Sequence, residues 1–276
     1  AEFGGGCYLK STSNPLMENV SFTQNTANNS GGGIGLKDNA NILGTNLTIS
    51  ENIAEGLGGG VYINNADPEL SFTLITNNTA SSGAGLYIRN NSEIDLTNLT
   101  VANNNAGLYG GGMYLRDDCT ITLSNSIIWD NSSSQIHFRS EGEEVELNVS
   151  YSLIENNQDG IATNDNGSLN WLEGNLDSEP YFCSSATGNY FVRENSPVLD
   201  GGFNGALVGC LSAGCGPVNL GPVWYVDSNG DNTSDGSLET PFETINWAVN
   251  TASNGDTIRL NPGVYFGSVD FDGKFL

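Results

Sequence analysis

A glycine triplet that returns about every 27 residues constrains this chain more than any other feature. The triplets begin at Gly4, Gly31, Gly58, Gly83 and Gly110, so the intervals are 27, 27, 25 and 27 residues. Each triplet is followed by a short apolar stretch: "CYL", "IGL", "VYI", "LYI" or "MYL". A fixed period of this length is typical of a repeat architecture in which each unit stacks on its neighbours.

Asparagines recur in step with the glycines. We place them at Asn25, Asn52, Asn77, Asn104 and Asn131, although Asn78 fits the "NTA" pattern better than Asn77 does. Both the asparagines and the glycines are expected to be structural, because asparagine tolerates left-handed turns and can form hydrogen-bonded ladders.

Apolar and hydroxyl residues alternate ahead of each asparagine. Leu47 and Ile49 flank Thr48 in one repeat, and Phe72 and Leu74 hold the apolar positions in the next. This period of two predicts half-buried strands, and no helical period is present. The repeat therefore predicts an all-β parallel solenoid. Its corner glycine ladder is expected at the middle triplet positions, namely Gly32, Gly59, Gly111 and the substituted Ala84.

The pattern "FxxN…GGG(I/V/M)(Y/G)(L/I)" resembles the right-handed parallel β-helix repeats of bacterial surface and secreted proteins, including polymorphic outer-membrane proteins, in the pectate-lyase-like superfamily. "NSIIWDN", "YSLIENN" and "NLDSEPYF" are similar to the closing coils of such proteins. The segment that begins "VWYVDSNGD" is similar to an opening cap. The resemblance implies a right-handed parallel β-helix at an extracellular or cell-surface location.

These parts predict a domain order. Residues 1–215 are interpreted as central and closing coils, 216–222 as a linker, and 223–276 as the opening cap of a following β-helix. Thr240, Pro241 and Glu243 form a capping-box pattern, which predicts one short capping α-helix over 241–253. We interpret the chain as part of a tandem array, or as a unit that packs head to tail.

Charge restricts the partners. The chain has 32 acidic and 8 basic residues, and its net charge is −24. Nucleic acid is not expected as a partner, because phosphate binding needs clustered Lys and Arg. No apolar run approaches the length of a membrane span.

The cysteines predict one disulfide bridge. Cys7 and Cys119 lie in or beside expected strands and are interpreted as packed thiols. Near the end of the first domain, the bridge is Cys210 to Cys215, or Cys183 to either of them. A zinc site is not expected, because the chain has one histidine and no paired CxxC.

Two patterns raise the question of a functional site. Asp117 and Asp118 beside Arg116, with Asp130 about one turn of the solenoid away, are candidates for the carboxylates of a polysaccharide lyase or hydrolase. Adjacent strand residues point to opposite faces, so this pair converges only within a turn. The lone His137 is interpreted as an outward strand residue. We predict that the chain is not an enzyme.

The loop "DSNGDNTSDG" places Asp227, Asn229, Asp231 and Asp235 at spacings that resemble an oxygen-ligand calcium loop. It lacks the distal Glu of an EF-hand, and the alternative is an Asp- and Gly-rich turn. No cofactor is expected to be required, and calcium is the one ion that the sequence suggests.

Two surface motifs remain. Two parallel rows of hydroxyl side chains, which begin with Ser21 and Thr23, would suit binding to ice or to crystalline polymers. Two positions after Thr73 the residue is Ile75, so the second row is expected to end after two coils. Tyr62, Tyr87 and Tyr114 share one repeat position; we interpret them as an inward stack, with glycan binding as the alternative.

The sequence thus predicts a non-catalytic, extracellular structural or adhesive β-helix segment of a filament, sheath or stalk. Its expected partners are copies of itself or tandem neighbours, and surface glycans. A carbohydrate-active or glycan-binding β-helix is the alternative.

Overall fold

The computed structural model describes residues 1–271 and 273–276, and the chain divides into two compact units. The first unit contains residues 1–192 and 196–214, and the second contains residues 193–195 and 215–276. All of the glycine triplets lie in the first unit.

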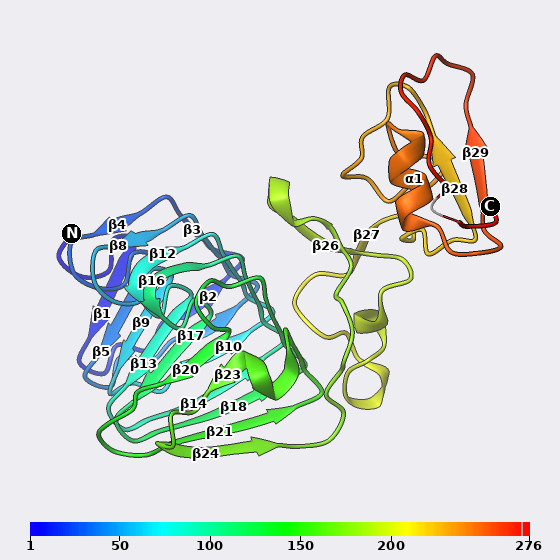
Figure 1. Cartoon of the computed structure of the whole chain (residues 1–276). Helices are drawn as coiled ribbons and strands as arrows, with labels where there is room; N and C mark the ends of the chain where they lie inside the picture. Colours follow the sequence, from blue (N-terminus) through cyan, green and yellow to red (C-terminus); the bar gives the residue numbers. More distant parts are fainter. Residues whose placement is uncertain (272) are drawn as a thin grey trace. The chain divides into compact units, whose positions relative to one another are not determined.

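Strands that follow the glycine triplets stack into one parallel sheet, which we call sheet 1 (Figure 1). Each strand pairs in register with the equivalent strand of the next coil, so that Ile34 lies between Cys7 and Val61. In spatial order the strands are β1 (Cys7–Lys10), β5 (Ile34–Lys37), β9 (Val61–Asn64), β13 (Leu86–Arg89), β17 (Met113–Arg116), β20 (Ile136–Phe138) and β23 (Ile161–Ala162).

Further parallel sheets complete each coil. Sheet 2 contains β2 (Leu16–Glu18), β6 (Leu43–Thr45), β10 (Glu69–Ser71), β14 (Ser92–Thr97), β18 (Cys119–Ser124), β21 (Val145–Ser150) and β24 (Gly167–Trp171). Sheet 3 contains β3 (Ser21–Thr23), β7 (Thr48–Ser50), β11 (Leu74–Thr76), β15 (Thr100–Ala102), β19 (Ile127–Trp129) and β22 (Leu153–Ile154). Sheet 4 contains β4 (Thr26–Ala27), β8 (Ile53–Ala54), β12 (Thr79–Ser82) and β16 (Asn105–Tyr109).

The core lies inside the coils, where sheets 1, 2 and 3 each contribute alternate residues. Ile88 of sheet 1, Ile94 of sheet 2 and Val101 of sheet 3 are buried together in one continuous apolar cluster. A single coil cannot enclose such a core, so each coil depends on its neighbours for burial. The structure confirms the predicted right-handed parallel β-solenoid.

The end of the first unit packs along the outer face of sheet 3. It contains β25 (Phe182–Ser184), most of β26 (Asn189–Arg193) and of β27 (Ala213–Cys215), and the short 3-10 helices Ser185–Thr187, Pro197–Leu199 and Phe203–Gly205. A further 3-10 helix, Asn157–Gly160, lies within the coils between β22 and β23. Val198 and Val208 form a second apolar cluster with Ile127 and Leu153.

The second unit is a small α/β assembly. β28 (Val223–Val226) pairs in parallel with β29 (Thr257–Leu260), and α1 (Ile245–Thr251) packs beside them (Figure 1). Ala248 and Ala252 of the predicted apolar stripe are buried against Trp224 and Val226. Among the described residues, no helix is long and apolar enough to cross a membrane.

The predicted start of this helix is wrong. Thr244, rather than Thr240, caps α1 by accepting a hydrogen bond from the Trp247 N–H at 3.3 Å. Phe242 forms an extended bridge with Val226, so the preceding residues are not helical. The Thr240 hydroxyl instead donates to Asp235. Tertiary pairing has overridden a local capping pattern.

Candidate binding surface

The outer face of sheet 1 carries aromatic and basic side chains side by side. In β13, Leu86 and Ile88 point into the core, so Tyr87 and Arg89 share the outer face. In-register pairing repeats this arrangement in β17, where the corresponding outer residues are Tyr114 and Arg116.

The aromatic side chains form a column along this face. Tyr62 and Tyr87 stack with ring centroids 5.7 Å apart, Tyr87 and Tyr114 at 5.1 Å, and Tyr114 and His137 at 5.5 Å. The three tyrosines are at most 8% exposed. Burial raises the pKa of Tyr87 and of Tyr114, and it lowers the pKa of His137. Neutral rings can therefore stack without charge repulsion.

The expectation of an inward tyrosine stack is wrong in one respect. The tyrosines are buried, but they form their own cluster outside the central core. Glycine corners cover them: Gly58 and Gly83 have φ of +64° and +60°, and a Cβ at either would lie 2.9 Å from a tyrosine Cβ. Glycine is therefore needed there for both its backbone angle and its small size.

The basic side chains converge on one carboxylate. Asp117 lies 3.6 Å from Arg89 Nη2, 2.5 Å from Arg116 Nε and 3.3 Å from Arg139 Nη1. Asp117 and Asp118 both have left-handed backbone angles, with φ of 56° and 59°. They therefore form a turn, and the turn directs only Asp117 to the arginines.

The structure does not bring the sequence's acidic candidates together. Asp118 is exposed at the corner between sheets 1 and 2. Asp130 follows β19 at a different corner, where its backbone N–H donates to Glu155. His137 faces outward as predicted, but it stacks on the exposed Tyr109 at 4.7 Å.

The asparagine ladder is a buried hydrogen-bonded row. Asn52 Oδ1 accepts from the backbone N–H and the side-chain amide of Asn25, at 3.0 and 2.9 Å. The same pair of hydrogen bonds joins Asn52 to Asn78, Asn78 to Asn104, and Asn104 to Asn131. Side-chain amides also donate to backbone carbonyls of the preceding coil, as Asn78 does to Ile49 at 2.9 Å.

The assignment of Asn77 to this ladder is wrong, and Asn78 occupies the position. Asn77 instead accepts from Asn103 in a second, outer row. The predicted strand positions around Phe72 and Leu74 are wrong by one residue for the same reason. Ile75 pairs with Ile49 and is buried, whereas Phe72 is 46% exposed at a corner with a left-handed backbone. One repeat is shortened, so a constant spacing fails there.

The shift changes the hydroxyl rows as well. Thr76 pairs with Ser50, so the second row of hydroxyl side chains continues for one more coil and ends at Ala102. Thr100 is buried and accepts a hydrogen bond from the Cys210 N–H. A flat array of exposed hydroxyls is not formed there.

The middle triplet glycines permit close approach of successive coils. A Cβ at Gly59 would lie 2.6 Å from the Thr79 carbonyl oxygen and 2.7 Å from that of Ala84. A Cβ at Gly32 or Gly111 would also contact a backbone oxygen, from Gly59 or Ser132 respectively. None of these three has a positive φ, so the expected corner strain belongs to the first glycine of each triplet.

Comparison with known families agrees with this geometry. The model of the family described as right handed beta helix region matches residues 32–196, which is more than half of the chain. The chain belongs to this right-handed β-helix family. No curated protein and no solved structure matches it.

In the predicted calcium loop of this β-helix protein, the carboxylates already have hydrogen-bond or ion-pair partners within the protein. Asp227 accepts from the Asn229 N–H, and Asp231 accepts from the Thr233 N–H, both at 2.8 Å. Asp235 pairs with Arg193 at 2.9 Å. These hydrogen bonds lower the pKa of Asp227 and of Asp231. The described residues contain no group of three or more His, Cys, Asp or Glu side chains that could hold a metal ion.

The cysteine prediction needs one correction. Cys183 and Cys215 are disulfide-bonded, and Cys210 is a free thiol, so the Cys210–Cys215 bridge is not formed. Burial raises the pKa of Cys210 and of Cys119 to about 11. Both cysteines are therefore packed thiols of low reactivity.

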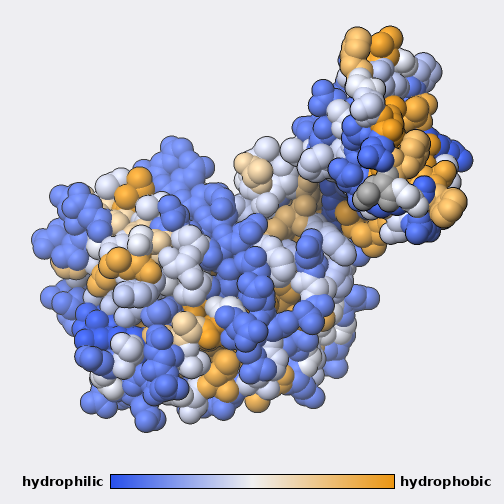
Figure 2. Space-filling view, in the orientation of Figure 1, coloured by the Kyte–Doolittle hydropathy of each residue, from blue (hydrophilic) through white to orange (hydrophobic). Residues whose placement is uncertain are grey.

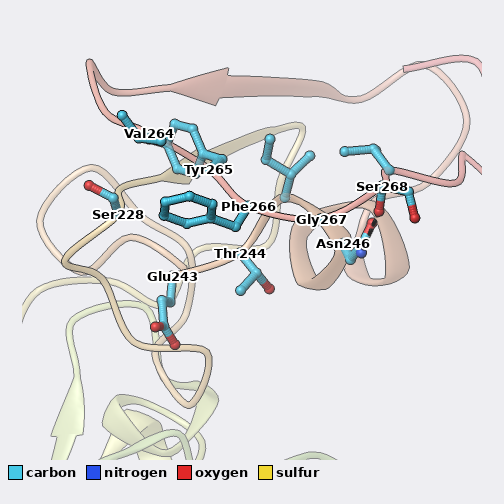
Figure 3. Close-up of a pocket in the computed structure, with 11 residues that line it drawn as sticks. Ser228, Glu243, Thr244, Asn246, Val264, Tyr265, Phe266, Gly267 and Ser268 are labelled. Carbon is cyan, nitrogen blue, oxygen red and sulfur yellow. Dashed lines mark hydrogen bonds between the residues drawn. The ribbon is translucent and has the colours of Figure 1, made fainter.

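A pocket of about 370 Å³ lies in the second unit of the β-helix protein (Figure 3). Val264 and Phe266 line it, and Asn246 donates to the Ser268 carbonyl at 3.0 Å beside it. Glu243 is the one carboxylate among its lining residues, and its side chain points away from the Phe266 ring. Hydroxyl, amide and apolar side chains therefore share the lining of this pocket.

Proposed function

We propose that this β-helix chain is a non-catalytic structural or adhesive segment of an extracellular or cell-surface protein. The observation that carries the proposal is the buried asparagine row, whose hydrogen bonds run from Asn25 to Asn131 along the stacking direction. The parallel sheets add backbone hydrogen bonds in the same direction. Tension along the axis therefore loads many bonds at once, as a stalk, sheath or filament requires.

The arrangement of the acidic residues supports a non-catalytic role. Glycosidases need two carboxyl groups that flank one bond. Here Asp117 is held by three guanidinium groups, and Asp130 lies at another corner of the coil. The chemistry that remains at the surface is recognition. No cofactor is part of this proposal.

The second unit supports contacts with further copies of the chain, head to tail, or with tandem neighbours. Val264, Phe266 and Phe275 are 69%, 95% and 84% exposed. Figure 2 shows hydrophobic surface gathered on this unit. Exposed apolar patches of this kind mark interaction sites.

Two measurements test the proposal. Antibodies against the purified chain should label unpermeabilised cells of the source organism, or material outside them. Electron microscopy of the native material should show rods with a regular axial repeat. Labelling only after permeabilisation, or the absence of rods, would contradict the structural role at the cell surface.

A further inference from the structure

One turn fastens the last coil of the solenoid to the coil before it. The last coil is taken as residues 161–171, which contain β23 and β24. β23 pairs with β20 through two residue pairs. The turn between β23 and β24 adds two side-chain hydrogen bonds. The Asn164 amide donates to the Phe138 carbonyl at 2.6 Å, and that of Asn166 donates to the Arg139 carbonyl at 2.8 Å. Attachment of the last coil at sheet 1 therefore depends on this turn.

The Asn164 amide also fixes the protonation state of His137, the one histidine of the chain. Asn164 Nδ2 lies 3.0 Å from His137 Nε2 and 2.6 Å from the Phe138 oxygen. A carbonyl oxygen only accepts, so the atom beside it is the amide nitrogen, and this nitrogen donates to Nε2 as well. His137 Nε2 is then unprotonated, and the ring proton lies on Nδ1. A proton on Nε2 would put two donors face to face.

The surroundings of His137 also favour the neutral ring. The elements packed against it carry these titratable or charged residues: Tyr109 of β16, Tyr114 and Arg116 of β17, Arg139 directly after β20, and Asp165 of the turn. Arg116 and Arg139 would repel an imidazolium, and Asp165 is exposed to water.

Two effects act in the opposite direction. The stacked tyrosine rings attract a cation, and so does the net charge of −24, but most of that charge is screened beyond about 10 Å in 0.1 M salt. Burial lowers the pKa of His137, so the neutral ring is the folded form.

We propose that His137 is an acid-sensitive latch for the last coil. Protonation at Nε2 breaks the hydrogen bond with Asn164, and the turn then loses its hold on β20. Opening of the last coil bares the edge of β20 and the buried side chains of Ile136 and Phe138, which another strand can then cover. The latch goes beyond the proposed structural role, because it makes one end of the solenoid respond to mild acid.

The sign of the pH effect follows from the neutral ring. The pKa of His137 is lower in the folded chain than its ordinary value of 6.5, so the opened coil takes up the proton at a higher pH than the closed coil does. The latch is therefore closed above pH 6.5, and it weakens as the pH falls below that value.

Nuclear magnetic resonance on the whole chain tests the latch, because a single histidine gives unambiguous ring signals. Titration of these signals should give a pKa below 6.5. Amide hydrogen exchange, corrected for the intrinsic effect of pH, is then compared at about pH 7.5 and about pH 5. We expect the protection of residues 161–171 to fall several-fold on acidification, while β9 in the middle of sheet 1 keeps its protection.

Two substitutions should change the pH dependence in different ways. His137→Gln keeps an acceptor oxygen for the Asn164 amide but does not titrate, so protection of the last coil should not change between the two pH values. Asn164→Asp places a carboxylate beside the ring, and aspartate tolerates the left-handed backbone there. The pKa of His137 should then rise, and acidification should increase the protection. Asp165→Asn changes the charge of the same turn without touching the His137 hydrogen bond, and it should behave like the wild-type chain.

A histidine pKa at or above 6.5, or equal protection of the last coil at both pH values, would overturn the proposal. An acid-induced loss that persists in His137→Gln, or that is as large in Asn164→Asp as in the wild-type chain, would overturn it too. Circular dichroism verifies that each variant is folded. If a variant does not fold, the wild-type titration and exchange still decide. A negative result leaves the structural role intact, because antibody labelling and electron microscopy test that role separately.

Discussion

Asn78 Oδ1 accepts two hydrogen bonds from Asn52, one from the Asn52 backbone N–H and one from the Asn52 side-chain amide, both at 2.9 Å. The Asn78 amide in turn donates to Asn104 Oδ1 and to the Ile49 carbonyl, each at 2.9 Å. All of these bonds are buried. One side chain therefore ties three successive coils together.

Asn78→Asp should be strongly destabilising. The substitution replaces the donating amide with an oxygen that faces two acceptor oxygens, and it buries a charge. We expect the free energy of unfolding to fall by about 3 to 5 kcal/mol. Urea denaturation followed by circular dichroism measures this change.

Asn77→Asp is the matched control for that change. Asn77 accepts a hydrogen bond from Asn103 in the outer row, and aspartate keeps this acceptor and tolerates the left-handed backbone. We expect an effect below about 1 kcal/mol. Equal losses in the two variants, or a larger loss at Asn77, would show that the ladder has been assigned to the wrong residue.

Gly59→Val should destabilise the chain by about 1 to 3 kcal/mol. The cause is the contact of its Cβ with carbonyl oxygens of Thr79 and Ala84, since Gly59 lacks a positive φ. Gly216→Val is the control, because no atom lies within 4 Å of a Cβ there. Differential scanning calorimetry should show a lower melting temperature for the first variant only.

Alkaline pH should weaken folding through the buried Cys119 thiol. Its pKa is raised from 9.0 to about 11 by burial. Below pH 9 the thiol is protonated in both states; between pH 9 and pH 11 it ionises first in the unfolded chain. Stability should therefore fall across this window by up to about 3 kcal/mol from this group. Cys119→Ala should show a smaller loss over the same window, and an unchanged slope would contradict this linkage.

Calcium should leave the melting temperature unchanged. The carboxylates of Asp227 and Asp231 already accept hydrogen bonds from their own turns, and Asp235 pairs with Arg193. Calorimetry with millimolar calcium and with chelator compares the two conditions. An increase with calcium that Asp231→Ala abolishes would establish a calcium site in this loop.

Repetition made the fold predictable. Five successive coils repeat the glycine triplet and the apolar strand that follows it, so the period alone indicates a solenoid. Local irregularities were not predictable in the same way: a shortened repeat moved Asn78 into the ladder and Phe72 to a corner. Likewise, the Phe242 bridge to Val226 overrode the capping pattern ahead of α1.

The candidate surface was only partly visible in the sequence. The tyrosine column shares one repeat position and was found there. The basic residues Arg89 and Arg116 lie two positions further on in their strands and were not predicted as a group, because Asn64 stands at the aligned position in β9. The strand spacing "YxR" in "LYIR" and "MYLR" is the signal that could have found it.

The length of an anionic polymer before and after incubation with the chain tests the central claim most directly, because it separates recognition from turnover. Heparin and polygalacturonate are incubated to completion with the wild-type chain and with Arg116→Gln, and their size is measured by gel filtration with light scattering. A non-catalytic surface predicts an unchanged polymer length in every sample. Shortening by the wild-type chain that Arg116→Gln abolishes would contradict the account and establish a carbohydrate-active β-helix.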